Sequence, residues 1–274
     1  MPELPEVETI ARGLDKRVRG AVIESVWLGK HREPLKSSAP EIAAVLRGAR
    51  ISQVRRVGKH IVFDLESKSS RNGKGQRQWI VHLGMTGQML VTSPEAELQK
   101  HTHAIASLSS GRELRFVDAR RFGRLSVTNE QGFAGPGTEP LTVTADDFAK
   151  LFHGRKTSIK AALLNQKLLH GVGNIYADES LFRAGIRPRR QAGRLTRVEL
   201  DRLHASLKEV LKEAIKLGGS SVSDYVDAEG RAGFFQLQHR VYLRTGQPCL
   251  VCKTPIKRLV LGGRGTHYCP QCQS

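Results

Sequence analysis

The spacing of apolar residues predicts a helix at the start of the chain. Pro5 suits the first turn of a helix, and the acidic Glu6 and Glu8 suit the positive end of its dipole. The apolar positions that follow have the i, i+3, i+4, i+7 spacing of one helix face: Val7, Ile10, Ala11, Leu14 and Val18. We therefore expect a helix that begins near Pro5, with Pro2 and Glu3 just ahead of it.

Residues 20–130 show a different pattern. Short β-branched runs alternate with clusters of Gly, Ser and Pro, which predicts a sheet sandwich or barrel. The clearest runs are Ala21–Trp27, Ile51–Val57, His60–Leu65, Trp79–Leu83 and Glu113–Phe116. The polar, Gly-containing stretch 67–78 predicts a hairpin loop, and Gly135-Pro136-Gly137-Thr138-Glu139-Pro140 predicts a linker.

Helical spacing returns after this linker. The predicted helices are Ala145–Phe152, Ile159–Leu169, Asn174–Ala184 and Arg197–Leu217. The last one ends at Gly218-Gly219, a common way to stop a helix, and the small polar residues 218–233 then predict a loop. The pattern thus predicts a β-rich domain at 1–134, a linker at 135–140, a helical domain at 141–235 and a small metal module at 236–274.

The charge balance points to a polyanionic partner. Lys and Arg number 44 against 26 Asp and Glu, which gives a net charge of +18. Such a field attracts nucleic acid first and an anionic membrane surface second. A ribosomal or histone-like role without catalysis fits the same charge. The chain has no run of 18 apolar residues and no secretory signal at its start, so we expect a reducing cytoplasm.

Four cysteines near the C-terminus predict a zinc site. Cys249-x-x-Cys252 and Cys269-x-x-Cys272 are separated by sixteen residues, the spacing of a tetrahedral four-cysteine zinc module. A site closed by four thiolates is structural, and two paired motifs in one short segment argue against a redox dithiol. From residue 231 to 274 there are seven Lys or Arg and no Asp or Glu, so the module suits DNA. Zinc ribbons of transcription and ribosomal proteins share this pattern.

The N-terminus offers a nucleophile. Once Met1 is removed, Pro2 carries a free amine whose pKa lies near about 7.7–8.0, so part of it is unprotonated at neutral pH. Attack of this amine on a sugar C1′ would give an iminium cation that acidifies the C2′ proton, and Glu3 is placed to transfer protons. Taken alone, these residues fit an ordinary cap before a helix better than they fit a catalytic site.

Six motifs in order resemble the formamidopyrimidine-DNA glycosylases, a bacterial repair family. They are Met1–Thr9, Arg55-Arg56-x-Gly58-Lys59, His82–Gly87, Asp118–Gly123, Lys156-Thr157-x-Ile159-Lys160 and Gly171–Ala177, and the four-cysteine module follows them at the C-terminus. The resemblance implies an α+β fold with two domains: an N-terminal β-sandwich with flanking helices, then a helix–two-turns–helix domain with a zinc finger. It also implies a bacterial, cytoplasmic enzyme that associates with the nucleoid through DNA.

The resemblance implies a reaction and its catalytic residues. The enzyme would flip out and excise oxidised purines, 8-oxoguanine and formamidopyrimidines, and then cleave the abasic strand by β,δ-elimination. Pro2 would form the Schiff base and Glu3 would be the acid/base. Lys59 would act in β-elimination and Arg264 in δ-elimination. Glu6 is either a second carboxylate facing the sugar or a first-turn helix residue.

The resemblance also implies a DNA interface. His101, Arg155 and Asn174 would contact DNA, and Met85, Arg120 and Phe122 would fill the space left by a flipped nucleotide. Without the family, Met85 and Phe122 would be read as core residues. Residues 218–233 match a loop that closes over the base and offers the polar side chains of Ser220, Ser221, Ser223 and Tyr225. Family members often carry Thr at the first two of these positions.

The implied partners are double-stranded DNA with an oxidised purine or abasic site and one structural zinc ion. A monomer without a membrane partner is expected.

Two alternatives remain open at this point. An endonuclease VIII-like glycosylase shares the fold and chemistry but acts on oxidised pyrimidines. Those enzymes typically begin Met-Pro-Glu-Gly-Pro-Glu, whereas Leu4 stands here. A non-catalytic, basic DNA-binding protein with a zinc ribbon is the alternative of another class, and it leaves the first six residues unexplained.

Overall fold

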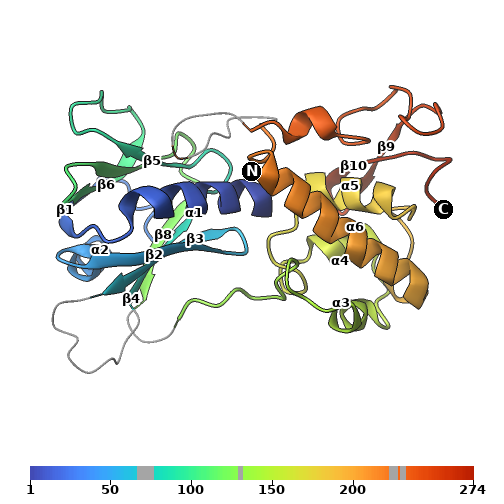
Figure 1. Ribbon diagram of the computed structural model, residues 1–274, viewed down its shortest axis with the longest axis horizontal. Coiled ribbons are helices and arrows are strands. Elements are labelled where there is room, and N and C mark those ends of the chain that lie inside the picture. The colour runs from blue at the N-terminus through green and yellow to red at the C-terminus, as the bar shows by residue number, and fades with distance from the viewer. Residues whose placement is uncertain (67–76, 129–131, 222–227, 229–232) are drawn as a thin grey trace. The chain divides into compact units, whose positions relative to one another are not determined.

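The computed structural model describes residues 1–66, 77–128, 132–221, 228 and 233–274, which belong to two compact units (Figure 1). The first unit comprises residues 1–134 and 218–233, and the second comprises 135–217 and 234–274. By its contacts the segment 218–233 therefore joins the N-terminal unit, whereas the sequence analysis assigned it to the helical domain. Most of the predicted 67–78 hairpin loop, and Ser223 and Tyr225, lie outside the described residues.

The described residues of the first unit form two antiparallel four-stranded sheets and two helices. One sheet has the order β1-β6-β7-β5 and the other β2-β3-β4-β8. The helices are α1 (Leu4–Val18) and α2 (Ala39–Leu46). The strands are β1 (Ile23–Leu28), β2 (Arg50–Val57), β3 (His60–Glu66), β4 (Arg77–His82), β5 (Gln88–Thr92), β6 (Thr102–Leu108), β7 (Glu113–Val117) and β8 (Arg124–Thr128).

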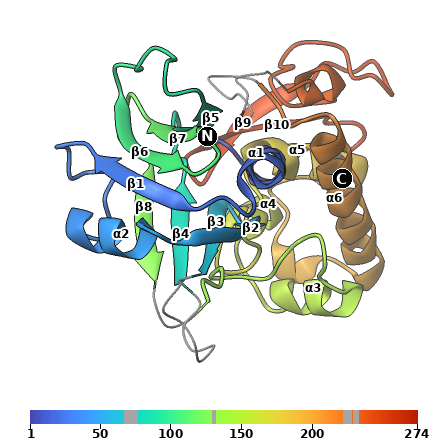
Figure 2. The same ribbon diagram turned by 60° about the vertical axis from the view of Figure 1, so that its left-hand side comes forward.

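One hydrophobic core holds the two sheets and both helices together. It contains Phe63 and Val81 from one sheet, Phe116 from the other, and the apolar face of α1. That face is the predicted one, and its five apolar side chains are at most 2% exposed. Helix α1 packs on β2 and β3 (Figure 2). The predicted sandwich is therefore confirmed, and α1 is a rigid support for the residues at its first turn.

Helix α2 is the element that the hydrophobic pattern missed. It lies within residues 20–130, where the pattern predicted strands alone. Its start carries a sequence signature: the Ser38 hydroxyl accepts from Glu41 N, and the Glu41 carboxylate accepts from Ser38 N, both at 3.3 Å. This capping box, with Pro40 in the first turn, indicates a helix even where the apolar run is short.

The second unit contains four α-helices and the hairpin of the metal module among its described elements. These are α3 (Ala145–Phe152), α4 (Ile159–Leu164), α5 (Asn174–Arg183) and α6 (Arg197–Lys216), two 3₁₀ turns (Ala192–Arg194 and Phe235–Gln238), and strands β9 (Lys257–Leu261) and β10 (Arg264–Tyr268). Three helices match their predicted bounds to within one residue. No helix in the described part of the chain has the length and apolar character needed to cross a membrane.

The predicted helix at 159–169 is wrong in its second half. Helix α4 ends at Leu164, because the next residue, Asn165, leaves the helical conformation. Its side-chain oxygen accepts a hydrogen bond from Lys167 N at 3.0 Å, and its backbone oxygen accepts from Leu168 N at 2.8 Å. A short polar side chain that bonds the backbone two residues ahead stabilises a turn in competition with the helix.

Candidate active site and nucleic-acid interface

Pro2 and Glu3 are set by the start of α1. Glu3 is the N-cap residue, with extended backbone angles, and its N–H donates to Glu6 Oε2 at 2.8 Å. Both Pro2 and Glu3 are buried, whereas Met1 is 44% exposed. The amino end of a helix carries partial positive charge, which stabilises a carboxylate placed there. The predicted nucleophile and the predicted acid/base are thus held next to each other by one well-packed helix.

Glu6 uses both carboxylate oxygens on backbone groups. Oε2 accepts from Glu3 N, and Oε1 accepts from Ser220 N at 2.8 Å. Gly219 allows this approach: its φ is +84°, and a Cβ there would lie 2.9 Å from Glu6 Cγ. Glu6 therefore ties the start of the 218–233 segment to the first turn of α1. This supports the first-turn interpretation, and direct action on the sugar stays a prediction.

Lys59 lies in the turn between β2 and β3, and an ion pair joins that turn to α1. Arg56 Nε donates to Glu8 Oε2 at 2.7 Å, and Arg56 Nη1 donates to Gly58 O at 3.2 Å. Arg56 is 5% exposed, so this pair is shielded from water. The turn that carries Lys59 is therefore positioned relative to the helix that carries Pro2.

The surroundings of Lys59 are cationic. Burial, followed by the charges of His60, Lys59 and Arg124, lowers the pKa of His82 to about 4. His82 is therefore neutral at physiological pH, and its Nδ1 accepts from Gly84 N at 3.2 Å. The excess positive charge that disfavours protonation of His82 is suited to a phosphate group.

Met85, Arg120 and Phe122 come together on two neighbouring turns. Met85 is 42% exposed and Phe122 is 45% exposed, so neither is an ordinary core residue. The turns touch at Gly84, where a Cβ would lie 2.6 Å from the carbonyl carbon of Phe122. The Arg120 guanidinium lies 4.6 Å from the centre of the Phe122 ring. Two apolar side chains and a stacked cation therefore project from one site.

In the second unit, Asn174 and Arg264 are connected through the finger hairpin. Asn174 begins α5, and its Nδ2 donates to Gly265 O at 2.9 Å, next to the exposed Arg264 at the start of β10. Arg155 is exposed in the loop between α3 and α4. In the first unit, His101 is exposed just before β6, and its carbonyl accepts from Asp118 N at 3.0 Å.

Sequence reasoning missed a buried ion pair beneath this hairpin. Lys160 on α4 and Asp178 on α5 are both 0% exposed, with Nζ 2.7 Å from Oδ1. Lys160 Nζ also donates to Gly265 O at 3.0 Å and to Thr266 Oγ1 at 2.8 Å. A lysine that follows Ile159 within an apolar helix was the available signal, since lysine is almost never fully buried without a partner.

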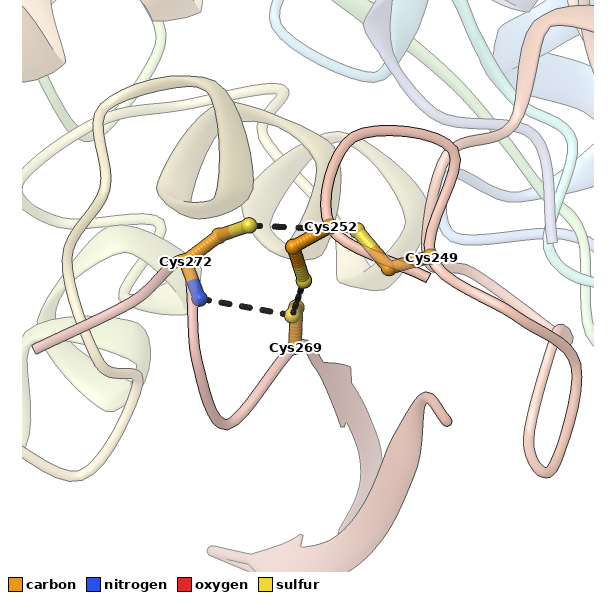
Figure 3. Close-up of side chains that lie close together, drawn as sticks. All are labelled: Cys249, Cys252, Cys269 and Cys272. Atoms are coloured by element: carbon orange, nitrogen blue, oxygen red, sulfur yellow. Dashed lines mark hydrogen bonds between the residues drawn. The ribbon is translucent and has the colours of Figure 1, made fainter. Parts of the chain in front are cut away.

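The four cysteines converge from two turns, one before β9 and one after β10 (Figure 3). Their sulfurs all lie within 4.8 Å of one another, with 3.9 Å between Cys249 and Cys272 and 3.4 Å between Cys252 and Cys269. Zn–S bonds of about 2.3 Å in a tetrahedron require sulfur separations of about 3.8 Å. Cys249 Sγ accepts from Val251 N at 3.4 Å, as a thiolate ligand would. The set fits one zinc ion bound by protein ligands alone, which is a structural site.

Family models match almost the whole chain. Residues 1–125 match the formamidopyrimidine-DNA glycosylase N-terminal domain, and residues 135–226 match the helix–two-turns–helix domain of the same enzymes. Residues 246–274 match the zinc finger found in FPG and IleRS. The last match agrees with the sulfur geometry, so the cofactor is one structural zinc.

Curated relatives and solved structures agree with these matches. The formamidopyrimidine-DNA glycosylase of Solibacter usitatus is 45% identical over 276 residues, covering 100% of this chain and 99% of the relative. The crystal structure of MutM (Fpg) from Thermus thermophilus is 41% identical, with a TM-score of 0.85 and coverage of 99% and 98%. A Lactococcus lactis Fpg bound to DNA with an abasic site is 31% identical, with a TM-score of 0.87 and 99% coverage of both chains. The chain belongs to the formamidopyrimidine-DNA glycosylase family of DNA base-excision repair enzymes.

Proposed function

We propose that this chain excises oxidised purines from double-stranded DNA through the amine of Pro2 and then cleaves the abasic strand. The observation that carries the proposal is the pairing of Pro2 and Glu3 at the buried start of α1. Related structures support the substrate class: Lactococcus lactis Fpg, 32% identical, was solved with DNA containing N7-benzyl-Fapy-dG, and the same enzyme with abasic-site DNA. The net charge of +18 suits the polyanion.

The chemistry follows from a terminal secondary amine. With Met1 removed, the Pro2 nitrogen attacks C1′ of the flipped nucleotide, and the bond from C1′ to the base breaks. The base leaves with the electron pair of that bond and takes up the proton that the Pro2 nitrogen loses. Glu3 donates a proton to the sugar ring oxygen as the ring opens, and an iminium forms between Pro2 and C1′.

The iminium then promotes strand cleavage. It withdraws electrons from C2′, so a proton is lost there and the C3′–O bond breaks, releasing the 3′ phosphate in β-elimination. Loss of a further proton expels the 5′ phosphate in δ-elimination. We assign Lys59 to the first elimination and Arg264 to the second, both as cations that stabilise the departing phosphates.

The remaining positions form the DNA interface. Met85, Phe122 and Arg120 would occupy the gap left by the flipped nucleotide, where apolar side chains replace the lost base stacking. Three residues would contact the DNA backbone: His101, Arg155 and Asn174. The enzyme would act as a monomer in the bacterial cytoplasm, bound to the nucleoid and without a membrane partner. Sedimentation at micromolar concentration tests the monomer.

Borohydride trapping tests the proposal. Protein whose mass confirms the loss of Met1 is incubated with a duplex carrying 8-oxoguanine opposite cytosine, and borohydride is added to reduce any iminium. A covalent adduct is expected. Duplex binding without an adduct would favour the non-catalytic alternative, and faster reaction with thymine glycol would favour the endonuclease VIII-like one.

Glu3→Gln isolates the proton-transfer step. The variant keeps the side-chain size and is expected to bind lesion DNA but to excise the base poorly. Glu24→Gln, an exposed change of the same kind on β1, is the matched control and should behave as wild type. Normal turnover by Glu3→Gln would refute the role assigned to Glu3.

A further inference from the structure

We propose that Asp118 is a positioning residue that holds Met85, Arg120 and Phe122 in the arrangement needed to extrude a paired nucleotide. The inference rests on the proposed function, since it concerns the orientation of the three side chains that would fill the gap left by the flipped nucleotide. Asp118 itself is 0% exposed and therefore does not reach DNA in the described structure. Its effect would pass through the two turns that it connects.

The Asp118 carboxylate accepts hydrogen bonds from both turns. Oδ1 accepts from Thr86 Oγ1 at 2.5 Å, next to Met85, and from Arg120 N at 3.2 Å. Oδ2 accepts from Gly123 N at 2.7 Å, next to Phe122. Each of the three void-filling positions is therefore either bonded to this carboxylate or adjacent to a residue that is.

The backbone of Asp118 is anchored as firmly as its side chain. Its N–H donates to His101 O at 3.0 Å, and its carbonyl accepts from the buried His103 Nε2 at 2.9 Å and from Arg121 N at 3.3 Å. Arg121 holds a φ of +56°, a conformation that is uncommon for residues other than glycine. The turn is therefore a constrained conformation that the surrounding bonds stabilise.

The connection between the turns is a hydrogen bond from the half-buried Thr86 to the buried Asp118 carboxylate. Bonds to an ionised acceptor are about twice as strong as neutral ones, and burial strengthens them further. The Thr86 hydroxyl, on the Met85 turn, donates to the Asp118 carboxylate. This hydrogen bond connects the Met85 turn to the turn that contains Arg120 and Phe122. Removing that hydroxyl would break the link from the Met85 turn to Asp118, while Asp118 keeps its bonds to Arg120 and Gly123.

Thr86→Val is therefore the informative variant, since it replaces the hydroxyl with a methyl group of similar size. Excision of 8-oxoguanine from a paired duplex is measured against β-elimination at a preformed abasic site. An abasic sugar has no base to unstack, so its processing depends less on void filling. The expected result is a loss of about tenfold in the excision rate, equivalent to ~1.4 kcal/mol, with abasic-site cleavage within about twofold of wild type.

Two further variants test whether the loss of excision is due to the Thr86 hydroxyl itself. Thr86→Ser restores a hydroxyl and should return excision to near the wild-type rate. Ser52→Ala removes a hydroxyl that donates to Asp64 O on the β2–β3 pair, away from both turns, and should leave both rates unchanged. A duplex with 2-aminopurine beside the lesion should show a smaller fluorescence rise on binding Thr86→Val, because fewer complexes unstack the neighbouring base.

The outcomes separate the inference from the proposed function. The proposed function would be refuted if the wild-type protein neither excised 8-oxoguanine nor formed an adduct. If wild type is active, the inference is overturned when Thr86→Val excises normally, or when both of its rates fall by the same factor. Equal losses would mean that the hydroxyl merely stabilises the fold. A selective loss that Ser repairs supports the positioning role.

Discussion

Replacing Lys160 by Met should selectively destabilise the second unit. The change keeps a long apolar side chain but removes the ammonium group that faces Asp178, Gly265 and Thr266. Asp178 Oδ2 would keep its bond from His267 N at 2.8 Å. Oδ1 has no well-aligned hydrogen bond among the described residues, although Lys160 Nζ is 2.7 Å away, so its compensation is mainly coulombic. The carboxylate would then remain buried without a counter-ion.

The expected loss is about 3 kcal/mol in the free energy of unfolding, because breaking one partner of a buried pair typically costs about 3–5 kcal/mol. The lower end applies since His267 N still bonds Asp178 Oδ2. Asp178→Asn in the Lys160→Met background removes the uncompensated charge. The double variant should therefore recover at least about 1 kcal/mol relative to the sum of the single changes.

The assay must report each unit separately. Trp79 is buried in the first unit, so its fluorescence during denaturant unfolding follows that unit. Release of zinc to a colorimetric chelator follows the finger in the second unit. Zinc release should shift to lower denaturant in Lys160→Met, with little change in the tryptophan transition. The argument from an uncompensated charge would be refuted if Lys160→Met lowered the free energy of unfolding by less than about 1 kcal/mol. It would also be refuted if the effects of Lys160→Met and Asp178→Asn were additive.

Three further outcomes are expected. Cys249→Ser, or removal of zinc by a chelator, should unfold the finger and weaken duplex binding in a gel-shift titration, and full affinity without zinc would contradict this. Pro2→Gly keeps a terminal amine, now a primary one, and should slow base excision in single-turnover assays, whereas an unchanged rate would argue against Pro2 as nucleophile. Burial lowers the pKa of His82 and of His239 to about 4, below the usual histidine value near 6.5. The unfolded chain therefore binds more protons between these values, so this contribution to stability is complete above pH ~6.5 and is lost as pH falls toward ~4. Thermal melts of His82→Gln should show a smaller loss between these pH values than melts of wild type.

Features set by local spacing were predictable from the sequence. The start and the buried face of α1 follow from Pro5 and the apolar period, and the zinc site follows from two short cysteine pairs. The end of α4 was not predicted, because the turn at Asn165 competes with a continuing helical pattern. Helix α2 was missed because it ends in a continuous apolar run, Ile42–Leu46, which periodicity alone does not distinguish from a buried strand. Its capping box could have been recognised in the sequence.

The hydrogen bonds that position the candidate site residues could not be predicted from the hydrophobic pattern, because they join groups far apart in the sequence. Glu6 bonds Ser220 across 214 positions, and Thr86 bonds Asp118 across 32. A periodic pattern contains information about which face of an element is buried, but it does not say which distant polar group meets another. At Lys160 the pattern even points the wrong way, because a charged residue on a helix suggests solvent and this one is 0% exposed. Each exception is a polar group held close to a predicted site residue: Glu3, Met85 or Arg264. Residues whose position in the fold conflicts with their local sequence preference are thus the ones that position the candidate site residues.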